Sequence, residues 1–188
     1  MPISTSPSTL LYQLGKGIIS IGDWVGAVAP TEYTDVGNCP SLSVEVTEEV
    51  LDHYSSRSGT KKKDKSITLE SGYKLSFDLD EISILNLKMY LKGTLLGQNV
   101  IRANTDLNKE YAIKFISDNP TGPDERWEFW KVKLSPNGAF SLIGDDWSKV
   151  SFNGEGLADE AGHATSPYFN VTFVTTTSST TTTTTTTA

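Results

Sequence analysis

The residues most able to do chemistry stand together in "LDHYSS", where Asp52, His53, Ser55 and Ser56 are near neighbours. An acid, a histidine and a serine are the groups of a nucleophilic hydrolase. The flanking sequence alternates as a β-strand does, and neighbours on a strand point to opposite faces, so adjacency does not supply the geometry of a catalytic triad. We therefore interpret His53 as a structural polar residue near a strand end, and we expect the chain not to be an enzyme.

Other side chains could hold a metal ion. Oxygen ligands alternate in "NTDLNKEY", at Asn104, Asp106, Asn108 and Glu110. The segment lacks the glycine and the bidentate glutamate that a calcium-binding loop needs, so we interpret it as an exposed turn, like "GDDW" at residues 144–147. A single cysteine, Cys39, excludes an internal disulfide framework, and two histidines argue against zinc. We expect no metal and no cofactor.

Two sets of side chains could bind a partner. Basic residues gather in one short segment, at Arg57, Lys61, Lys62, Lys63 and Lys65. They could contact an acidic surface of another protein, or they could keep an exposed loop soluble. Trp127, Trp130 and Trp147 could stack against sugar rings, although tryptophans that alternate with aliphatic residues lie more often in a core.

The elements that must position these residues are mostly strands. Within a lead-in of residues 1–40, "LLYQLGKGIISIG" predicts one or two short strands and "DWVGAVAPTEYTDVGNCP" predicts a loop. "SLSVEV" alternates and predicts a half-buried strand. The polar segment 55–65 predicts an exposed loop that projects from the two strands it joins.

The segment after this loop is unusually long for a strand. Apolar residues take most odd positions of "ITLESGYKLSFDL", and a turn at Ser71-Gly72 would put Glu70 opposite Tyr73, mixing polar with apolar on one face. We therefore predict one strand over residues 66–79 with a bend at the glycine. At about 3.3 Å per residue it would be roughly 45 Å long, well beyond a typical strand of about 6 residues.

The remaining chain predicts one helix and several strands. The period changes to about 3.6 in "ISILNLKMYLKG", which predicts a helix over residues 84–92. Ser83 is its predicted N-cap, Ile82 and Leu87 take the staple positions, and Gly93 takes the left-handed C-terminal position. Strands are predicted at "YAIKFIS", "RWEFWKVKL", "AFSLIG", "WSKVSFNGE" and "YFNVTFV", with "SPNGA" as an Asn-Gly hairpin turn.

Composition narrows the class of protein. A chain of 188 residues, 37% of them hydrophobic, can bury one core, and we assign one domain to residues 1–174. The net charge of -7 argues against binding a nucleic-acid duplex by neutralising its phosphates. No basic residue precedes the short apolar run at the N-terminus, and no segment approaches about 18 consecutive apolar residues, so we expect neither a signal peptide nor a membrane span. We expect synthesis in a cytoplasm.

Residues 175–187 are all threonine or serine. Such a segment can be an O-glycosylated stalk, a solvated tail, or a strand-like strap on a neighbouring subunit. We interpret the Thr-rich segment 175–188 as a strap on the outer surface or between subunits.

The long strand predicts self-assembly. Its free edge must be covered or paired to avoid aggregation, and head-to-tail pairing of identical subunits around an axis closes a ring. The polar face of the strand would then line a central channel. The predicted channel-lining residues are Glu45, Thr47, Thr68, Glu70, Lys74, Ser76 and Asp78. Most of the charges are acidic, so a DNA duplex in the channel would be repelled rather than captured.

Several phrases resemble a known family. "LGKGIISIG", "DVGNCPSLSVEV", "VLDHYSSRSGTKKKDKSITLESGYKLSFDLDEIS" and "KVKLSPNGAFSLIGDDWSKVSFNGE" occur in this order, with "ILNLKMYLKG" after the third. Together they resemble the major tail tube protein of long-tailed, non-contractile (siphovirus-type) bacteriophages. The resemblance covers roughly residues 10–174.

This resemblance implies a β-sandwich flanked by one short α-helix, assembled into stacked hexameric rings that form a hollow tube. It implies that the loop at 55–65 reaches the neighbouring ring, where its basic residues meet acidic groups, and that an N-terminal arm at residues 1–14 helps to join rings. Many relatives carry an additional immunoglobulin-like domain, whereas this sequence ends in threonines, which argues against a role in adhesion to the host surface.

The resulting prediction is a structural virion protein of the tail tube, a conduit for DNA ejection into the host. Its predicted partners are further copies of itself, the tape measure protein, and the tail terminator and distal tail proteins. DNA is expected to pass through without sequence-specific binding, and no membrane is expected as a partner. The alternative from the residues alone is a monomeric β-sandwich binding module for carbohydrate that uses the three tryptophans. The long polar-faced strand beside a lysine-rich loop distinguishes the two, because a monomeric module has no need of it.

Overall fold

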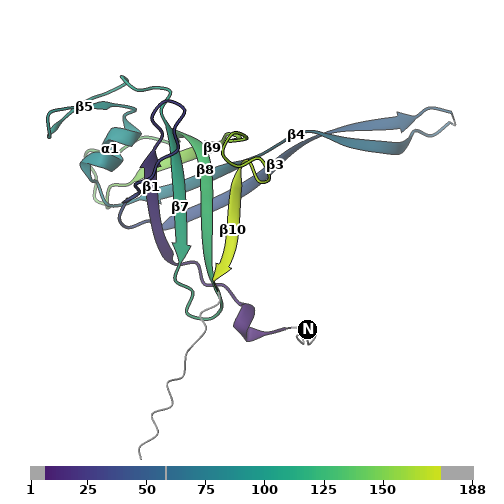
Figure 1. The fold of residues 1–188 in the computed structure, drawn as a ribbon, viewed down its shortest axis with the longest axis horizontal. Coiled ribbons are helices and arrows are strands. Elements are labelled where there is room, and N and C mark those ends of the chain that lie inside the picture. Colours follow the sequence, from purple (N-terminus) through teal and green to yellow (C-terminus); the bar gives the residue numbers. More distant parts are fainter. Residues whose placement is uncertain (1–6, 58, 175–188) are drawn as a thin grey trace, which may run out of the picture.

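The computed structural model describes residues 7–57 and 59–174 (Figure 1). In these residues the elements are the 3-10 helix η1 (Thr9–Leu11), the α-helix α1 (Ile84–Tyr90) and the strands β1 (Gly17–Asp23), β2 (Thr34–Asp35), β3 (Ser41–Ser55), β4 (Lys62–Leu79), β5 (Thr94–Leu96), β6 (Val100–Arg102), β7 (Glu110–Ser117), β8 (Asp124–Pro136), β9 (Val150–Gly156) and β10 (Phe169–Val174). The prediction of a mainly β chain with one α-helix is confirmed for this part of the chain.

Eight strands form one antiparallel sheet in the order β2-β1-β7-β8-β9-β4-β3, with β10 also paired to β8. One edge of β8 faces β7, and its other edge is shared, because β10 pairs with residues 124–129 and β9 with residues 132–136. The sheet therefore divides at β8 into two halves. In Figure 1 the strands β1, β7, β8 and β10 run side by side and cross β3, β4 and β9. A separate pair, β5 and β6, follows α1.

One hydrophobic core lies between the two halves of the sheet. The odd-numbered residues of β4 from Tyr73 to Leu79 are buried, as their alternation predicted. Phe77 stacks on Phe152 of β9 with ring centroids 5.0 Å apart, and Tyr73 packs against Phe129 of β8 at 5.4 Å. The core thus joins the long strand to both halves of the domain.

The helix begins as predicted and ends differently. The Ser83 side chain accepts a hydrogen bond from the backbone N–H of Asn86, which confirms the N-cap. The left-handed residue at the C-terminal end is Lys92, with φ of 46°, and not Gly93 as predicted. Gly93 is required for a different reason, because a Cβ there would lie 2.6 Å from the carbonyl oxygen of Arg102. The close approach of β6 to the helix explains this glycine.

The connection between β8 and β9 contradicts two predictions. Gly138 has a φ of +80°, but Asn137 and Gly138 do not close a two-residue hairpin turn. Residues 137–149 form one loop between the strands, and "AFSLIG" within it is not a strand. Phe140 packs against the core, whereas the apolar side chains at 142 and 143 are exposed, so the alternation there does not reflect a strand.

The strand that begins with "SLSVEV" and the long strand after it are both longer than predicted. β3 continues to Ser55, and β4 begins at Lys62, so the connecting loop is shorter than the predicted segment 55–65. β4 runs through Gly72 without a turn, which confirms one continuous strand. In Figure 1 the two strands leave the domain together as a hairpin.

The described part of the predicted N-terminal arm, residues 7–14, lies against the turn before β8. Asn119 accepts a hydrogen bond from the backbone N–H of Leu14 at 3.2 Å and donates one to the carbonyl of Tyr12 at 3.1 Å. The first six residues and the Thr-rich segment 175–188 lie outside the described residues, so the predictions made for them stay predictions. Among the described residues, no helix has the length and apolar character to cross a membrane.

Candidate assembly surface

The hairpin of β3 and β4 extends beyond the rest of the sheet. β9 pairs with β4 only over Lys74–Leu79, so residues 47–55 and 62–72 form a two-stranded ribbon, which together with the described residues of its loop is here called the arm. At about 3.3 Å per residue the arm reaches roughly 35 Å from the domain. A two-stranded hairpin alone in water is marginally stable. The arm therefore has the form of an element that a partner completes.

Apolar side chains cover much of the arm. Five large ones are between 44% and 54% exposed: Val50, Leu51, Tyr54, Ile67 and Leu69. They come from both strands and from both faces of the ribbon. Neighbouring apolar side chains exposed on a narrow ribbon mark an interaction surface rather than a solvated one.

Two bulges in β4 change which side chains share a face of the arm. Glu49 pairs with Glu70, but the next residue of β3, Val50, pairs with Thr68, which leaves Leu69 as the inserted residue. Directly opposed residues share a face. Thr68 accordingly donates a hydrogen bond to Glu48, 3.3 Å away, on the face opposite Glu70. The prediction that Thr68 joins Glu70 on one polar face is therefore wrong, because the bulge reverses the alternation.

The other six predicted channel residues do lie on one face of the sheet. Cross-strand pairing brings together Glu45 with Lys74, Ser43 with Ser76, Ser41 with Asp78, Thr47 with Gly72 and Glu49 with Glu70. We call this surface, together with its continuation on β9 and β8, the polar face. Whether it lines a channel stays a prediction.

The polar face continues across strands that sequence reasoning did not include. Lys74 pairs with Glu155 of β9, Glu155 pairs with Lys133 of β8, and Lys133 pairs with Glu110 of β7. With Glu45 at its end, this row alternates negative and positive charge across five strands. The alternation of "VSFNGE" could have revealed the polar positions on β9, but only the strand order places them beside β4.

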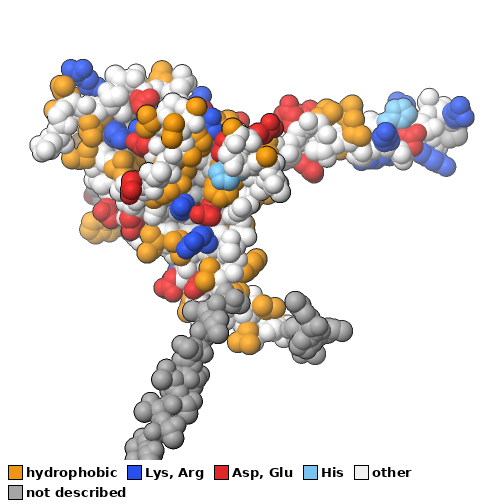
Figure 2. Space-filling view, viewed as in Figure 1, with side chains coloured by type: hydrophobic (Ala, Val, Ile, Leu, Met, Phe, Trp, Pro, Cys, Tyr) orange, Lys and Arg blue, Asp and Glu red, His pale blue; other side chains and the backbone are white. Residues whose placement is uncertain are grey.

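Charge is separated along the arm. The basic residues predicted to contact another ring lie at its outer end, with Arg57 and Lys61 in the loop and Lys62, Lys63 and Lys65 in β4. Figure 2 shows this basic end and, nearer the domain, an acidic zone. In that zone Glu49 and Glu70 are directly opposite each other, an arrangement that destabilises an isolated sheet.

The groups that resembled a catalytic triad are held apart in the arm. Asp52 accepts from Lys63 at 2.6 Å and from Ser66 at 2.7 Å, and these bonds lower the pKa of its carboxyl, Lys63 having the larger effect. His53 instead contacts Asp64, with 2.6 Å between Nδ1 and Oδ1. His53 is thus a polar residue near the strand end, and the geometry of a triad is not formed.

The segment with alternating oxygen ligands forms turns that lead into β7, which begins at Glu110. Asn104 is left-handed with φ of 54°. Glu110 pairs with Lys131 at 3.0 Å, and Asn108 accepts a hydrogen bond from Lys133 at 3.5 Å. Across residues 7–57 and 59–174, no cluster of three or more His, Cys, Asp or Glu side chains is suited to holding a metal ion.

The three tryptophans do not share a surface. Trp127 stacks on Phe169 and donates to Glu125, beside the core. Trp130, on the opposite face of β8, stacks on His163 with ring centroids 3.7 Å apart. Trp147 lies on the loop between β8 and β9. A stacking platform made by all three for a sugar is therefore not formed.

Comparisons with known proteins give one family and several solved structures. A family described as "Protein of unknown function UCP028589" matches residues 12–99, which include β1 to β5 and α1. No curated protein matches the chain.

The similar solved structures share little sequence with this chain. A chain of the PVC sheath-tube complex, an extracellular contractile injection system in the extended state, is 16% identical with a TM-score of 0.41, and the match covers 92% of this chain and 99% of that chain. A chain of the anti-feeding prophage tube terminating cap is 11% identical with a TM-score of 0.41, covering 93% and 100%. A chain of the anti-feeding prophage baseplate is 10% identical with a TM-score of 0.44, covering 92% and 97%.

Proposed function

We propose that this protein is a structural tail subunit whose copies assemble, through the arm, into hexameric rings that stack into a hollow tube. The tube is a conduit for DNA ejection into the host, and the subunit is a β-sandwich with no catalytic role. The observation that carries this proposal is the arm, because its two strands leave the domain with apolar side chains exposed and with charge separated along their length.

The arm lacks a partner in the single subunit, and this supports assembly into a closed ring. Identical subunits that meet head to tail around an axis give each arm a neighbour, and closure leaves no free strand edge. The long strand β4 turns its buried residues Leu75 and Phe77 toward the core of its own subunit. The opposite, polar face of the same strand then points toward the axis of the ring.

The composition of the polar face supports a conduit. Its acidic residues are Glu45, Glu49, Glu70, Asp78 and Glu155, against the basic residues Lys74 and Lys133. Serines, a threonine and an asparagine occupy the rows between the charges. Such a wall offers no continuous basic surface for phosphate groups, so DNA would pass without being retained.

The charge separation supports stacking. The basic outer end of the arm and the acidic zone around Glu49 and Glu70 are complementary if the arm of one ring reaches the base of the arms in the next. The N-terminal arm would add a second connection between rings. In this arrangement the like-charged pair of glutamates, unfavourable in the isolated chain, gains a basic partner.

The proposed setting is the tail tube of a non-contractile virion, as the sequence resemblance implies. The tape measure protein would fill the tube before ejection, and terminator and distal tail proteins would cap its ends. A tube within a contractile sheath is the alternative setting. Copurification of assembled tubes with a sheath protein from the source particles would distinguish the two.

The experiment that tests the proposal is negative-stain electron microscopy of the purified protein over a concentration series. We expect rings or hollow tubes of uniform diameter. The matched variant replaces residues 51–66 by a short Asn-Gly turn; none of the described residues in this range is buried, so we expect the domain to stay folded. A folded variant that no longer assembles would support the proposal. Tubes of the same diameter without the outer arm, or no assembly of the intact chain at any concentration, would contradict it.

A further inference from the structure

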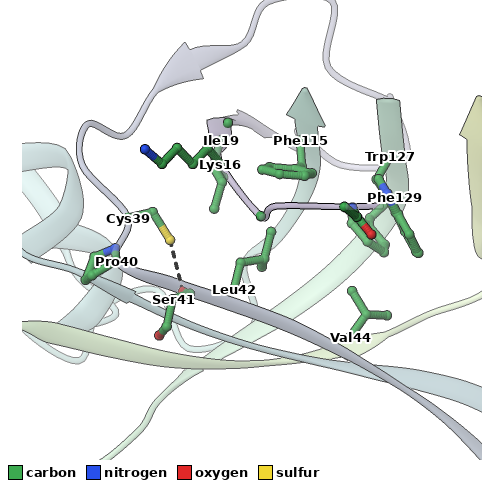
Figure 3. Close-up of a pocket in the computed structure, with 13 residues that line it drawn as sticks. Lys16, Ile19, Cys39, Pro40, Ser41, Leu42, Val44, Phe115, Trp127 and Phe129 are labelled. Atoms are coloured by element: carbon green, nitrogen blue, oxygen red, sulfur yellow. Dashed lines mark hydrogen bonds between the residues drawn. The ribbon is translucent and has the colours of Figure 1, made fainter. Parts of the chain in front are cut away.

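An apolar groove opens beside β3, the last strand of the sheet. It has a volume of about 320 Å³, and its walls come from both halves of the domain (Figure 3). The residues that shape it include Lys16, Ile19, Cys39, Leu42, Phe115 and Trp127. We call it the Cys39 groove. It is of the size that buries one or two large side chains, and no residue of the β8–β9 loop lines it.

A second feature, elsewhere in the fold, presents large side chains to solvent. In the loop between β8 and β9, Leu142 is 85% exposed, Ile143 96% and Trp147 92%. We call residues 141–148 the Trp147 loop. The Ser148 hydroxyl donates to the Ser141 carbonyl at 3.0 Å, which closes the ends of the loop on each other.

The shape of this loop is set by its own hydrogen bonds. The Ser141 hydroxyl also donates to the carbonyl of Ile143 at 3.0 Å. The apolar side chains therefore project because the backbone is held, and a loop already held in shape loses less entropy when it binds. A tryptophan beside two aliphatic residues is typical of the anchors that dominate binding energy at protein interfaces.

The charges of the two features are complementary. Asp145 and Asp146 stand between the apolar side chains of the loop, and both are exposed. Lys16 lies exposed at the rim of the Cys39 groove (Figure 3), and none of the ion pairs among the described residues includes it. An apolar loop with acidic residues thus matches an apolar groove with a basic rim.

We propose that the Trp147 loop of one copy binds in the Cys39 groove of a second copy. Trp147 and Ile143 fill the groove, and the two aspartates face Lys16. The contact joins different surfaces of the two copies, so each copy can bind one neighbour on either side and the contact repeats into a ring or a filament. The inference rests on the proposed function and extends it by naming a contact between subunits outside the arm.

Cross-linking tests this contact directly, because Cys39 is the single cysteine of the chain. The variant Ile143→Cys is oxidised at the concentration where the protein assembles. Burial raises the pKa of the Cys39 thiol, so the reaction is run at about pH 9, where more of the thiol is ionised than at neutral pH. We expect covalent species of two, three and more chains on a non-reducing gel, since a head-to-tail contact continues beyond a dimer.

The controls separate this contact from accidental cross-links. Cys39→Ser combined with Ile143→Cys should form no ladder, and Leu107→Cys, at an exposed residue that neither lines the Cys39 groove nor belongs to the Trp147 loop, should form none with Cys39. Ladders of equal yield in either control would overturn the proposal. So would an Ile143→Cys variant that forms only an internal disulfide within one chain, or no disulfide at all.

Assembly measurements test the same contact without cysteine chemistry. Trp147→Ala should raise the concentration for half-maximal assembly at least about tenfold, the loss expected for an interface anchor, while Leu107→Ala leaves it unchanged. Replacing Asp145 and Asp146 by Lys should weaken assembly, and adding Lys16→Glu should restore it. Restoration identifies the facing charges, and a failure to restore overturns the assignment of Lys16.

Failure of this contact and failure of the proposed function are distinguishable. Tubes that form normally from Trp147→Ala would overturn the contact and leave the proposed function intact. If the unaltered chain forms no tubes, the proposed function fails, and the Ile143→Cys ladder decides the contact independently.

Discussion

Asp52 joins the two strands of the arm near its outer end. Its carboxyl binds Lys63 and Ser66, and its pKa lies below the ordinary value of 3.8. Because the folded pKa is lowered, the stabilisation is fully present above that ordinary value and is lost as the pH falls through the lowered pKa. The contribution of Asp52 to the pairing of the two strands should therefore be lost in acid.

We predict that Lys63→Met moves the pKa of Asp52 back toward its ordinary value, because the largest cause of the shift is removed. Titration of the carboxyl signal by NMR measures this. Lys65→Met is the matched control, since Lys65 lies opposite His53 on the other face. Equal shifts of the Asp52 pKa in the two variants would contradict the assignment.

The packing of Tyr73 against position 156 requires a glycine there. A Cβ at this position would collide with the ring of Tyr73, which is 1% exposed in the core. We predict that Gly156→Ala lowers the free energy of unfolding by about 1–3 kcal/mol, as overpacking does. Chemical denaturation measures the change. Gly59→Ala, in the loop of the arm where a Cβ meets nothing within 4 Å, should change it by less than about 0.5 kcal/mol, and a loss as large as at Gly156 would show that packing is not the cause.

At the scale of elements, the arm is a strand pair that belongs to the sheet at one end only. The core fixes its base through Tyr73, Leu75 and Phe77, whereas among the described residues the outer half pairs with no other strand of the sheet. The two bulges increase the local twist of the ribbon and place Leu69 and Asp64 outside the regular pairing. The direction and the exposed faces of the arm thus follow from where these insertions occur.

We predict that Lys61→Glu combined with Lys62→Glu raises the concentration needed for tube growth, because the basic end of the arm would then repel the acidic zone of the next ring. The measurement is turbidity against protein concentration at several salt concentrations. Assembly of the unaltered protein should weaken as salt screens the contact.

The matched control is Arg102→Glu on β6. It also replaces a basic residue by an acidic one, but at a position outside the arm. Assembly of the Lys61→Glu, Lys62→Glu variant at the normal concentration would contradict a specific role for the basic outer end of the arm. An equal loss of assembly in the Arg102→Glu control would contradict it too.

At the scale of the whole molecule, the polar face is a property of four neighbouring strands and not of one. The uncharged row of Ser43, Ser76, Asn153 and Ser135 lies next to the charged row of Glu45, Lys74, Glu155 and Lys133, and pairing across β3, β4, β9 and β8 aligns it. If this face lines the tube, every copy contributes the same row to the wall.

We predict that Ser43→Lys combined with Asn153→Lys leaves tubes able to assemble but slows DNA delivery, because a ring of added positive charge retains phosphate groups. The measurement is infectivity of particles that carry the variant, together with electron microscopy of their tails. Gln98→Lys combined with Leu107→Lys adds the same charge on other surfaces and should leave delivery unchanged. Normal infectivity of the first variant would place the polar face away from the path of the DNA.

The sequence by itself determined which segments form most strands, the start of the helix, and the continuity of the long strand through Gly72. Alternation and capping are local, so they can be recognised in residues close together in the chain. The same local pattern failed in "AFSLIG", where apolar alternation belongs to a loop, and at Thr68, where one inserted residue reverses the faces.

Only the tertiary structure decided the strand order, the extent of the arm and the row of charges from Glu45 to Glu110. Each depends on which distant strands pair, and no local pattern records that Glu155 lies beside Lys74 or that β9 stops where the arm begins. The Cys39 groove and the Trp147 loop have the same origin, because exposure of a side chain is set by everything that does or does not pack over it.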